Sequence, residues 1–238
     1  MDRKLVVIPT YNEKENIIAI CRAVLSLPEI YEILVIDDAS PDGTADLVRA
    51  MQTEYEDRLH LLCRPGKQGL GTAYISAFKW ALERGYDYVF EMDADFSHDP
   101  ADLVRLYKKC SEDGADYTVG SRYCKGVNVV NWPMKRVLMS WGASKYVRFV
   151  LGIPVHDCTA GFVCYKASVL RGMDLDSIQM KGYGFQIEMK YTAWKLGFVP
   201  AEVSVIFRDR TQGKSKMSSS IFGEAFWGVL KLRLRKIK

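Results

Sequence analysis

Features that mark a membrane-spanning or secreted chain are missing from this sequence of 238 residues. No apolar run reaches the roughly 18–20 residues that a membrane-spanning helix needs. No signal peptide is visible, because Met1–Lys4 leads directly into the apolar segment Leu5–Ile8. The six cysteines contain no C-x-x-C pair, so we expect reduced, buried thiols rather than a disulfide framework or a zinc site. We therefore expect a chain that does not span a bilayer.

A broad excess of one charge sign is also missing. The chain holds 33 basic and 29 acidic side chains, a net charge of +4. Five of the basic side chains, and no acidic one, lie in the last eight residues, so the first 230 residues are close to neutral. The positive charge is a C-terminal feature, which argues against a general nucleic-acid-binding surface.

Two common nucleotide-binding motifs are absent. The glycine-bearing segment 64–71 lacks the Gly-Lys-Ser/Thr ending of a P-loop. The first apolar segment is followed by Pro-Thr-Tyr-Asn-Glu at 9–13, where a dinucleotide dehydrogenase has G-x-G-x-x-G. Neither class of protein is supported.

Short apolar segments instead alternate with amphipathic ones. We expect strands near 5–8, 33–36, 59–63, 88–92, 117–120 and 199–207. We expect helices near 14–27, 44–55, 72–84, 100–113, 136–151, 184–196 and 218–237. This alternation predicts right-handed βαβ units and an α/β fold with a mostly parallel central sheet flanked by helices. Polar clusters follow the first, second and fourth strands, and ligands usually bind at that edge of such a sheet.

The fourth strand runs into Asp93-Ala94-Asp95, the segment on which the functional hypothesis depends. If both carboxylates lay on the strand, their i, i+2 spacing would point them to the same side. Carboxylate oxygens are the ligands that Mg²⁺ and Mn²⁺ prefer. An acidic turn that caps the next helix is the simpler alternative, but Asp99 can supply that cap.

Three later segments each have two interpretations. The apolar helix near 136–151 is either a core helix or one that lies at a lipid surface or under a lipid ligand. The loop 208–216 has four cations in nine residues, which suits closure over phosphates but also a solvated surface. The final helix places Phe222, Phe226, Leu230, Leu234 and Ile237 at helical spacing among basic residues. It is typical of a membrane-surface helix, yet it could pack on the sheet or pair with a membrane subunit.

Taken together and in order, these motifs resemble those of family 2 glycosyltransferases of the GT-A fold, and more narrowly polyprenol-phosphate (dolichol-phosphate) mannosyltransferases. The resemblance runs from Val6 to about Lys216. The matching blocks are Pro9-Thr10-Tyr11-Asn12-Glu13, Asp37-Asp38-x-Ser40-Pro41-Asp42-Gly43-Thr44, Met92-Asp93-Ala94-Asp95, Gly120-Ser121-Arg122-Tyr123, Asn131-Trp132-Pro133 and Gly213-Lys214-Ser215-Lys216.

The resemblance implies a role for each of these positions. Guanosine of a GDP-mannose donor would contact Pro9, Tyr11, Glu13, Ile36 and Asp38. Ribose, diphosphate and metal would contact Asp93, Ala94 and Asp95. The donor's phosphates or sugar would contact Arg122, Arg210 and Lys216. The phosphate of a polyprenyl phosphate acceptor would contact Arg136 and Ser140. The catalytic residues would be Asp95, Arg210 and Lys216.

The implied reaction is a single, inverting displacement that needs no base, because a polyprenyl phosphate is already anionic. Mg²⁺ or Mn²⁺ would stabilise the departing GDP. Asp93, Asp95 and Ser97 would hold the metal, with Ser97 standing where some relatives have glutamine. None of the three histidines is placed convincingly as a nucleophile.

The same resemblance divides the chain into a catalytic domain, 1–217, and a basic amphipathic C-terminal helix, 218–238. It implies a cytoplasmic protein that is peripheral on the cytoplasmic face of a membrane. A small membrane subunit is a candidate partner, and nucleic acid is not. Two alternatives stay open. One is a transferase of glucose or N-acetylglucosamine that uses a UDP-sugar, and the other is a non-catalytic subunit that binds a nucleotide sugar.

Overall fold

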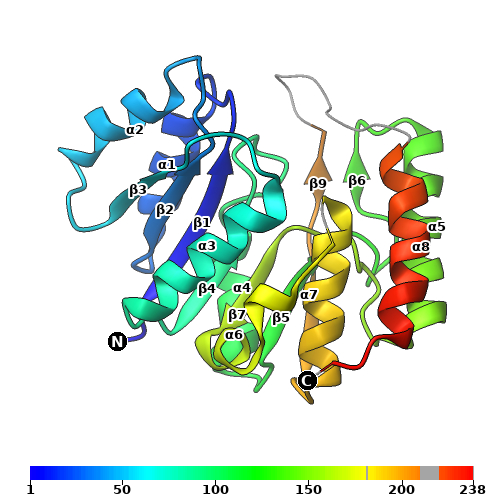
Figure 1. Ribbon diagram of the computed structural model, residues 1–238. Coiled ribbons are helices and arrows are strands. Elements are labelled where there is room, and N and C mark those ends of the chain that lie inside the picture. The colour runs from blue at the N-terminus through cyan, green and yellow to red at the C-terminus, as the bar shows by residue number, and fades with distance from the viewer. Residues whose placement is uncertain (181, 210–219, 238) are drawn as a thin grey trace.

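The computed structural model describes residues 1–180, 182–209 and 220–237, and strands and helices alternate along them as predicted (Figure 1). The first elements are β1 (Lys4–Thr10), α1 (Ile17–Leu25), β2 (Glu32–Asp37), α2 (Thr44–Gln52), β3 (Leu59–Cys63), α3 (Leu70–Glu83), β4 (Tyr88–Glu91), α4 (Asp102–Ser111) and β5 (Tyr117–Ser121). The later elements are β6 (Val129–Val130), α5 (Met134–Leu151), β7 (Val163–Lys166), α6 (Ala167–Gly172), the 3-10 helix η1 (Leu175–Ser177), α7 (Tyr183–Lys195), β8 (Pro200–Ser204), β9 (Phe207–Arg208) and α8 (Ser220–Leu234).

Within those residues, seven strands form one sheet in the order β3-β2-β1-β4-β7-β5-β8. Only β7 runs antiparallel to its neighbours in this sheet. The predicted α/β class with a mostly parallel sheet is confirmed, whereas β7 was not predicted. Because β7 is reversed, the segment before it, 157–162, reaches the edge at which the parallel strands end. A second, two-stranded sheet pairs β6 with β9 in parallel.

Both faces of the large sheet are covered, which explains why the strands are continuously apolar. Leu5 and Val7 of β1 point into one hydrophobic cluster, and Val6 and Ile8 point into another. The first cluster packs against α3, α5, α6, α7 and α8, and the second against α1, α2 and α4. Each fully buried aliphatic side chain contributes about 1.5–3 kcal/mol, so the two clusters hold the strand ends in fixed positions.

Strand β1 is longer than expected and continues through Pro9 to Thr10. Its neighbour β4 pairs with it only as far as Val7, whereas β2 pairs with it up to Thr10. Pro9 therefore lies where one side of β1 has no strand partner, and its missing N–H costs no ladder hydrogen bond on that side.

Helices α5 and α8 lie side by side at one end of the molecule (Figure 1). The inner face of α5 buries Val147 and Leu151, but Trp141 and Phe149 are exposed. The core-helix hypothesis thus holds only for the inner face of α5.

Helix α8 does not bury the stripe that the sequence suggested. Val229 and Leu232 are buried, whereas Phe226 and Leu234 are 45% and 87% exposed. Val229 and Leu232, rather than Phe226 and Leu234, thus pack against the core. Apolar side chains lie on both the inner and the outer side of this helix.

Two predicted absences agree with the structure. None of the helices in residues 1–180, 182–209 and 220–237 has the length and hydropathy to cross a bilayer. All six cysteines are free thiols, and four of them are buried.

Candidate active site

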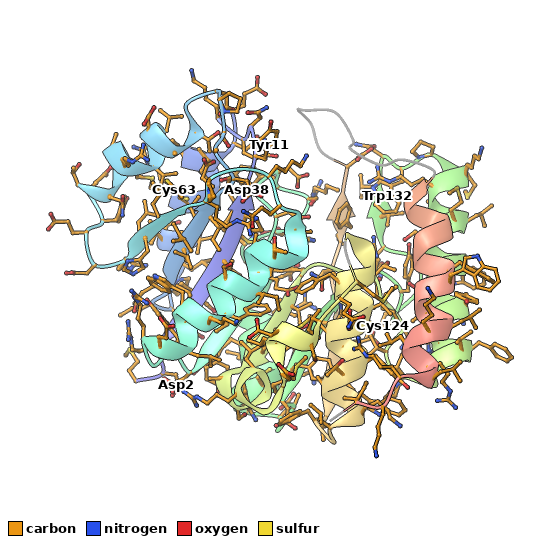
Figure 2. The ribbon with its side chains drawn as sticks, in the orientation of Figure 1. Asp2, Tyr11, Asp38, Cys63, Cys124 and Trp132 are labelled. Atoms are coloured by element: carbon orange, nitrogen blue, oxygen red, sulfur yellow. The ribbon has the colours of Figure 1, made fainter. Side chains whose placement is uncertain are left out.

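The polar segments that follow the strands meet at one edge of the sheet. Tyr11 follows β1, Asp38 follows β2, Arg64 follows β3, Asp93 follows β4 and Arg122 follows β5. These strands are mutually parallel, so their carboxyl ends share this edge. Figure 2 shows Tyr11 and Asp38 together at the upper ends of β1 and β2. The predicted donor-binding residues that the structure describes are thereby brought to one edge.

The loops after β1 and β2 are tied together by the carboxylate of Asp37. It accepts hydrogen bonds from the Thr10 hydroxyl at 3.0 Å and from the Ser40 N–H at 2.9 Å. In the other direction, the Ser40 hydroxyl accepts from the Asn12 N–H at 3.0 Å. The backbone around Pro9, Tyr11, Glu13 and Ile36 is therefore held by side chains of the neighbouring loop.

Asp38, a predicted guanosine contact, already has a partner. Arg64 donates from Nε to Asp38 Oδ1 at 2.6 Å and from an NH2 group to Oδ2 at 2.8 Å, and both side chains are buried. Such a bidentate ion pair fixes the planes of both the guanidinium group and the carboxylate group. Arg64 also donates to the Thr72 hydroxyl at 2.8 Å. Arg64 is thus a residue of this site that the sequence interpretation did not single out.

The loop after β3 also reaches Tyr11. The ammonium group of Lys67 lies 4.7 Å from the centre of the Tyr11 ring, a cation–π contact. This contact places a positive charge beside the loop after β1.

Asp93 and Asp95 lie on a turn, because β4 ends at Glu91. The prediction that an extended strand points both carboxylates to one side is therefore wrong in its geometry. The turn itself orders the segment: Asp95 Oδ1 accepts from the Ser97 N–H at 3.1 Å, and Phe96 has a φ of 58°. A positive φ is rare for a bulky residue and costs about 1–3 kcal/mol, which the surrounding contacts must offset. Asp99 accepts from the Ala101 N–H in the turn before α4, but the N-cap of α4 is Ala101 and has no side-chain cap, so the prediction that Asp99 is the N-cap is wrong.

His98 stabilises this acidic turn through its imidazole ring. Its Nδ1 accepts a hydrogen bond from the Asp93 N–H at 3.1 Å, and its ring stacks on Phe162 at 4.7 Å between centroids. Burial lowers the pKa of His98 to about 4, although the nearby Asp95 opposes the change. The imidazole is neutral at pH 7, as an acceptor at Nδ1 must be, so His98 has a structural role here.

The donor atoms around the turn fit a hard divalent cation. Asp93 and Asp95 offer carboxylate oxygens, and the Ser97 Oγ is buried with no hydrogen-bond partner among the described residues. The described part of the chain holds no group of three or more acidic, histidine or cysteine side chains arranged for a metal. Mg²⁺-type sites commonly use one or two carboxylates and take further oxygens from substrate phosphates and water. The residues present therefore fit an ion that is completed by a phosphorylated substrate.

Arg122, a predicted phosphate contact, is oriented by Asp157. Its Nε and one NH2 group donate to the two Asp157 oxygens at 2.6 Å each, and its backbone N–H donates to Oδ2 at 2.9 Å. Asp157 is fully buried. Burial alone would raise the pKa of Asp157, but the Arg122 charge and hydrogen bonds hold it below its ordinary value. The pair is charged and rigid, and Asp157 is a second site residue that the sequence interpretation did not assign.

A second buried polar network includes Glu91, the last residue of the strand that leads into the Asp93 turn. Gln186 on α7 donates to the fully buried Glu91 at 2.6 Å and accepts from Lys190 at 3.0 Å. Lys190 also donates to the Ala160 carbonyl at 2.6 Å. Burial raises the pKa of Glu91 and lowers that of Lys190, and each charge opposes the shift of the other. This network joins α7 and the 157–162 segment to the strand that carries the acidic turn.

The predicted acceptor-phosphate residues lie on the first turns of α5. Arg136 stacks on Trp132, with its guanidinium carbon 3.9 Å from the ring, and donates to Asp209 at 2.8 Å. Arg122 lies 5.5 Å from the same Trp132 ring, so both arginines that were predicted to bind the substrates contact this indole. Figure 2 shows Trp132 near the upper ends of β6 and β9. Ser140 is one turn further along α5. The remaining predicted residues, Arg210 and Lys216, lie outside the described residues.

Comparison with known proteins assigns a family to this arrangement. The model of the family described as Glycosyl transferase family 2 matches residues 5–173. A protein of Mycolicibacterium smegmatis named polyprenol monophosphomannose synthase is 44% identical over 234 residues, covering 98% of this chain and 88% of that protein. A Micrococcus luteus protein named undecaprenyl-phosphate mannosyltransferase is 46% identical over 233 residues, covering 95% of this chain and 94% of its own.

Solved structures agree at the level of the fold. Glucosyl-3-phosphoglycerate synthase from Mycobacterium tuberculosis, in complex with phosphoglyceric acid, matches with a TM-score of 0.71 at 18% identity, covering 97% of this chain and 80% of that one. The complex of that enzyme with Mn²⁺, uridine diphosphate and glucosyl-3-phosphoglycerate matches with a TM-score of 0.68 at 19% identity, covering 98% and 79%. The predicted GT-A fold is thus confirmed.

Proposed function

The chain belongs to glycosyl transferase family 2, and we propose that within this family it transfers mannose from GDP-mannose to a polyprenyl phosphate. The observation that carries this proposal is the identity of 44% and 46%, over nearly the whole chain, to two proteins named for mannosyl transfer to polyprenyl phosphates. The geometry supports it, because the described donor-binding and metal-binding candidates lie at one sheet edge and Arg136 contacts the same Trp132 ring as Arg122.

The proposed reaction balances without a proton transfer. An oxygen of the acceptor phosphate bonds to the anomeric carbon of mannose, and the bond from that carbon to the GDP oxygen breaks, its electron pair leaving with GDP. A phosphate monoester has a second pKa near 6, so the acceptor is already largely dianionic at pH 7. A single displacement inverts the anomeric centre. Neither His98 nor the buried Glu91 and Lys190 needs to act as a base.

Asp93, Asp95 and Ser97 would hold Mg²⁺ or Mn²⁺ in the presence of the donor. When bound, the ion supplies charge neutralisation for the departing diphosphate. Support comes from the oxygen-only donor set of the turn and from the Mn²⁺ complex of the M. tuberculosis enzyme that shares this fold.

The chain's own residues then position the donor. The Asp38–Arg64 pair and Tyr11 would contact the base, and the Arg122 guanidinium, held in place by Asp157, would face the diphosphate. Arg210 and Lys216 would add positive charge to the leaving group from the 210–216 segment. Positioning and electrostatic stabilisation of the leaving group are the main sources of catalysis here.

A lipid acceptor requires access to a membrane, and α5 and α8 offer a surface suited to it. We define the outer face as the exposed apolar residues Leu138, Trp141, Phe149, Phe226, Trp227 and Leu234. Exposed cations lie on the same two helices: Lys135, Lys145, Lys231 and Arg233. Clustered aromatic and basic side chains are typical of helices that lie on anionic bilayers. We propose that this face rests on the cytoplasmic face of a membrane, with Arg136 of α5 next to the lipid headgroups.

One C-terminal cation does not contribute to that surface. Arg235 pairs with the buried Glu188 of α7. Glu188 also accepts from the Gln179 N–H at 3.0 Å. Arg235 therefore fastens the end of α8 to the core.

Vesicle sedimentation tests the membrane proposal. The double variant Trp141→Ser/Phe149→Ser should lose most binding to vesicles of anionic phospholipid, while its melting temperature stays unchanged because both side chains are exposed. Ile30→Ser is a matched control, since Ile30 is 54% exposed on another part of the surface. Equal binding by all three proteins would overturn the assignment of this face.

A transfer assay tests the enzymatic proposal. Purified protein is incubated with radiolabelled GDP-mannose and a short polyprenyl phosphate, with Mn²⁺ or Mg²⁺ and then with a chelator. Label should enter the lipid fraction only when metal is present, and UDP-glucose should give none. Transfer from UDP-glucose but not from GDP-mannose would overturn the donor. No transfer from either donor, with nucleotide binding retained, would favour a non-catalytic subunit.

A further inference from the structure

The start of α5 has an unusual distribution of charge. Its N-cap is Pro133, which makes no side-chain cap, and the first turn contains no acidic residue. Lys135 and Arg136 lie there instead. The unpaired N–H groups and the helix dipole already make this end positive, so two cations are unfavourable unless an anion compensates them. A helix start of this kind favours an anionic ligand.

An anion of the chain itself pairs with one of these two cations, Arg136. Asp209 accepts a hydrogen bond from Arg136 at 2.8 Å, and the two side chains are 30% and 24% exposed. The β6–β9 sheet brings the two segments together, since the Asp209 N–H donates to the Val130 carbonyl at 3.1 Å, just beyond the end of β9. The Trp132 ring stacks on the Arg136 guanidinium, and the Asp209 carboxylate binds the edge of the same guanidinium.

The side chains around Arg136 offer more hydrogen-bond donors than the Asp209 carboxylate uses. The indole N–H of Trp132 is buried and has no hydrogen-bond partner among the described residues. Arg122 and Arg136 both lie against the Trp132 ring, with their guanidinium carbons 5.5 Å and 3.9 Å from its centre. Arg136 and Ser140, spaced i, i+4, share a face of α5. A phosphate monoester, with three terminal oxygens, matches such a cluster better than a carboxylate does.

We propose that Asp209 is a built-in competitor of the acceptor phosphate for Arg136. This inference rests on the proposed function for the identity of the acceptor. The incoming phosphate monoester, close to a dianion at pH 7, displaces the single charge of Asp209. Transfer of the sugar turns the monoester into a diester with one negative charge. The Asp209 carboxylate and the product phosphodiester then each carry one negative charge. Asp209 therefore competes more effectively with the product for Arg136, which promotes release of the product.

The direct test is equilibrium binding of farnesyl phosphate, measured by calorimetry without any donor. Asp209→Asn keeps the size of the side chain and removes its charge. Partly exposed ion pairs are weak, so removing this competitor should tighten binding by roughly two- to fivefold. Asp46→Asn is the matched control, because Asp46 forms an exposed pair with Arg49 on α2. Unchanged or weaker binding by Asp209→Asn would overturn the proposal, and Asp209→Ala should repeat the result.

Two further measurements separate competition from a structural effect. In an Arg136→Gln background, Asp209→Asn should give no further gain in affinity, because the contested cation is gone. In the transfer assay, Asp209→Asn should lower the KM for the acceptor and the inhibition constant of the product by the same factor. The KM for the donor should not change. A gain that persists in the Arg136→Gln background would refute competition for Arg136.

These outcomes distinguish the inference from the proposed function. If no mannose is transferred but Asp209→Asn still tightens the binding of farnesyl phosphate, the competitor stands and the proposed reaction is wrong. If mannose is transferred and farnesyl phosphate binds both proteins equally, the reaction stands and the competitor is wrong.

Discussion

Replacing Asp157 with alanine tests how strongly the site depends on its buried ion pair. Asp157 is fully buried and accepts three hydrogen bonds from Arg122: one from the backbone N–H and two from the guanidinium. Arg122 is itself only 7% exposed. The substitution leaves a buried guanidinium without its counter-charge.

Removing one partner of a buried ion pair costs about 3–5 kcal/mol. In a chain of this size each kcal/mol lowers the melting temperature by about 2–4 °C, so we expect a fall of roughly 6–20 °C. The double variant Arg122→Gln/Asp157→Asn should lose less stability than Asp157→Ala, because it leaves no unpaired charge buried. Circular dichroism during heating measures both, and a melting temperature of Asp157→Ala equal to the wild type would refute this reasoning.

The pH dependence supplies an independent check. The pKa of Asp157 is lowered in the folded state, since Arg122 outweighs the effect of burial. A lowered folded-state pKa means that the pair stabilises the fold above the unfolded-state pKa, about 3.9, and that this contribution is lost as pH falls through the folded-state pKa. The stability gap between wild type and Asp157→Ala should be constant from about pH 5 to 8 and close in stronger acid. A gap that widens in acid would contradict the assignment.

Other predictions concern single positions. Gly71→Val should cost about 1–3 kcal/mol in urea unfolding, because a Cβ at Gly71 would lie 2.8 Å from the buried Phe185 ring; wild-type stability would contradict this packing of α3 on α7. Ser97→Ala should raise the Mn²⁺ concentration for half-maximal transfer about tenfold, and an unchanged requirement would exclude Ser97 from the metal shell. At pH 8, Ellman's reagent should label the exposed Cys63 first and leave Cys21 unlabelled until the protein unfolds, since burial raises the pKa of Cys21 to about 12; early labelling of Cys21 would show that its cluster opens.

Much of the fold follows from local sequence patterns. Apolar runs such as 5–8 and 33–36 predict the strands because both faces of the sheet are covered there. Strand β7 was missed because it is only four residues long and reversed, and periodicity cannot separate so short a run from a core segment. The apolar run Phe162-Val163-Cys164-Tyr165 was the available indication.

The residues of the candidate site also fall into two groups, those that the sequence could place and those that it could not. Residues directly after strands, such as Tyr11, Asp38 and Asp93, could be placed from the sequence because parallel strands end at one edge. Their partners could not. Arg64 is 26 residues from Asp38, and Asp157 is 35 residues from Arg122, so each pairing depends on the three-dimensional path of the chain.

The central claim is that mannose is joined to a polyprenyl phosphate. It is tested most directly by following the reaction of GDP-mannose with farnesyl phosphate and Mg²⁺ by ³¹P NMR. We expect the monoester signal to be replaced by a phosphodiester signal as an equal amount of GDP appears, and the product sugar to have the opposite anomeric configuration to the donor. Release of GDP with free mannose and an unchanged monoester signal would contradict it.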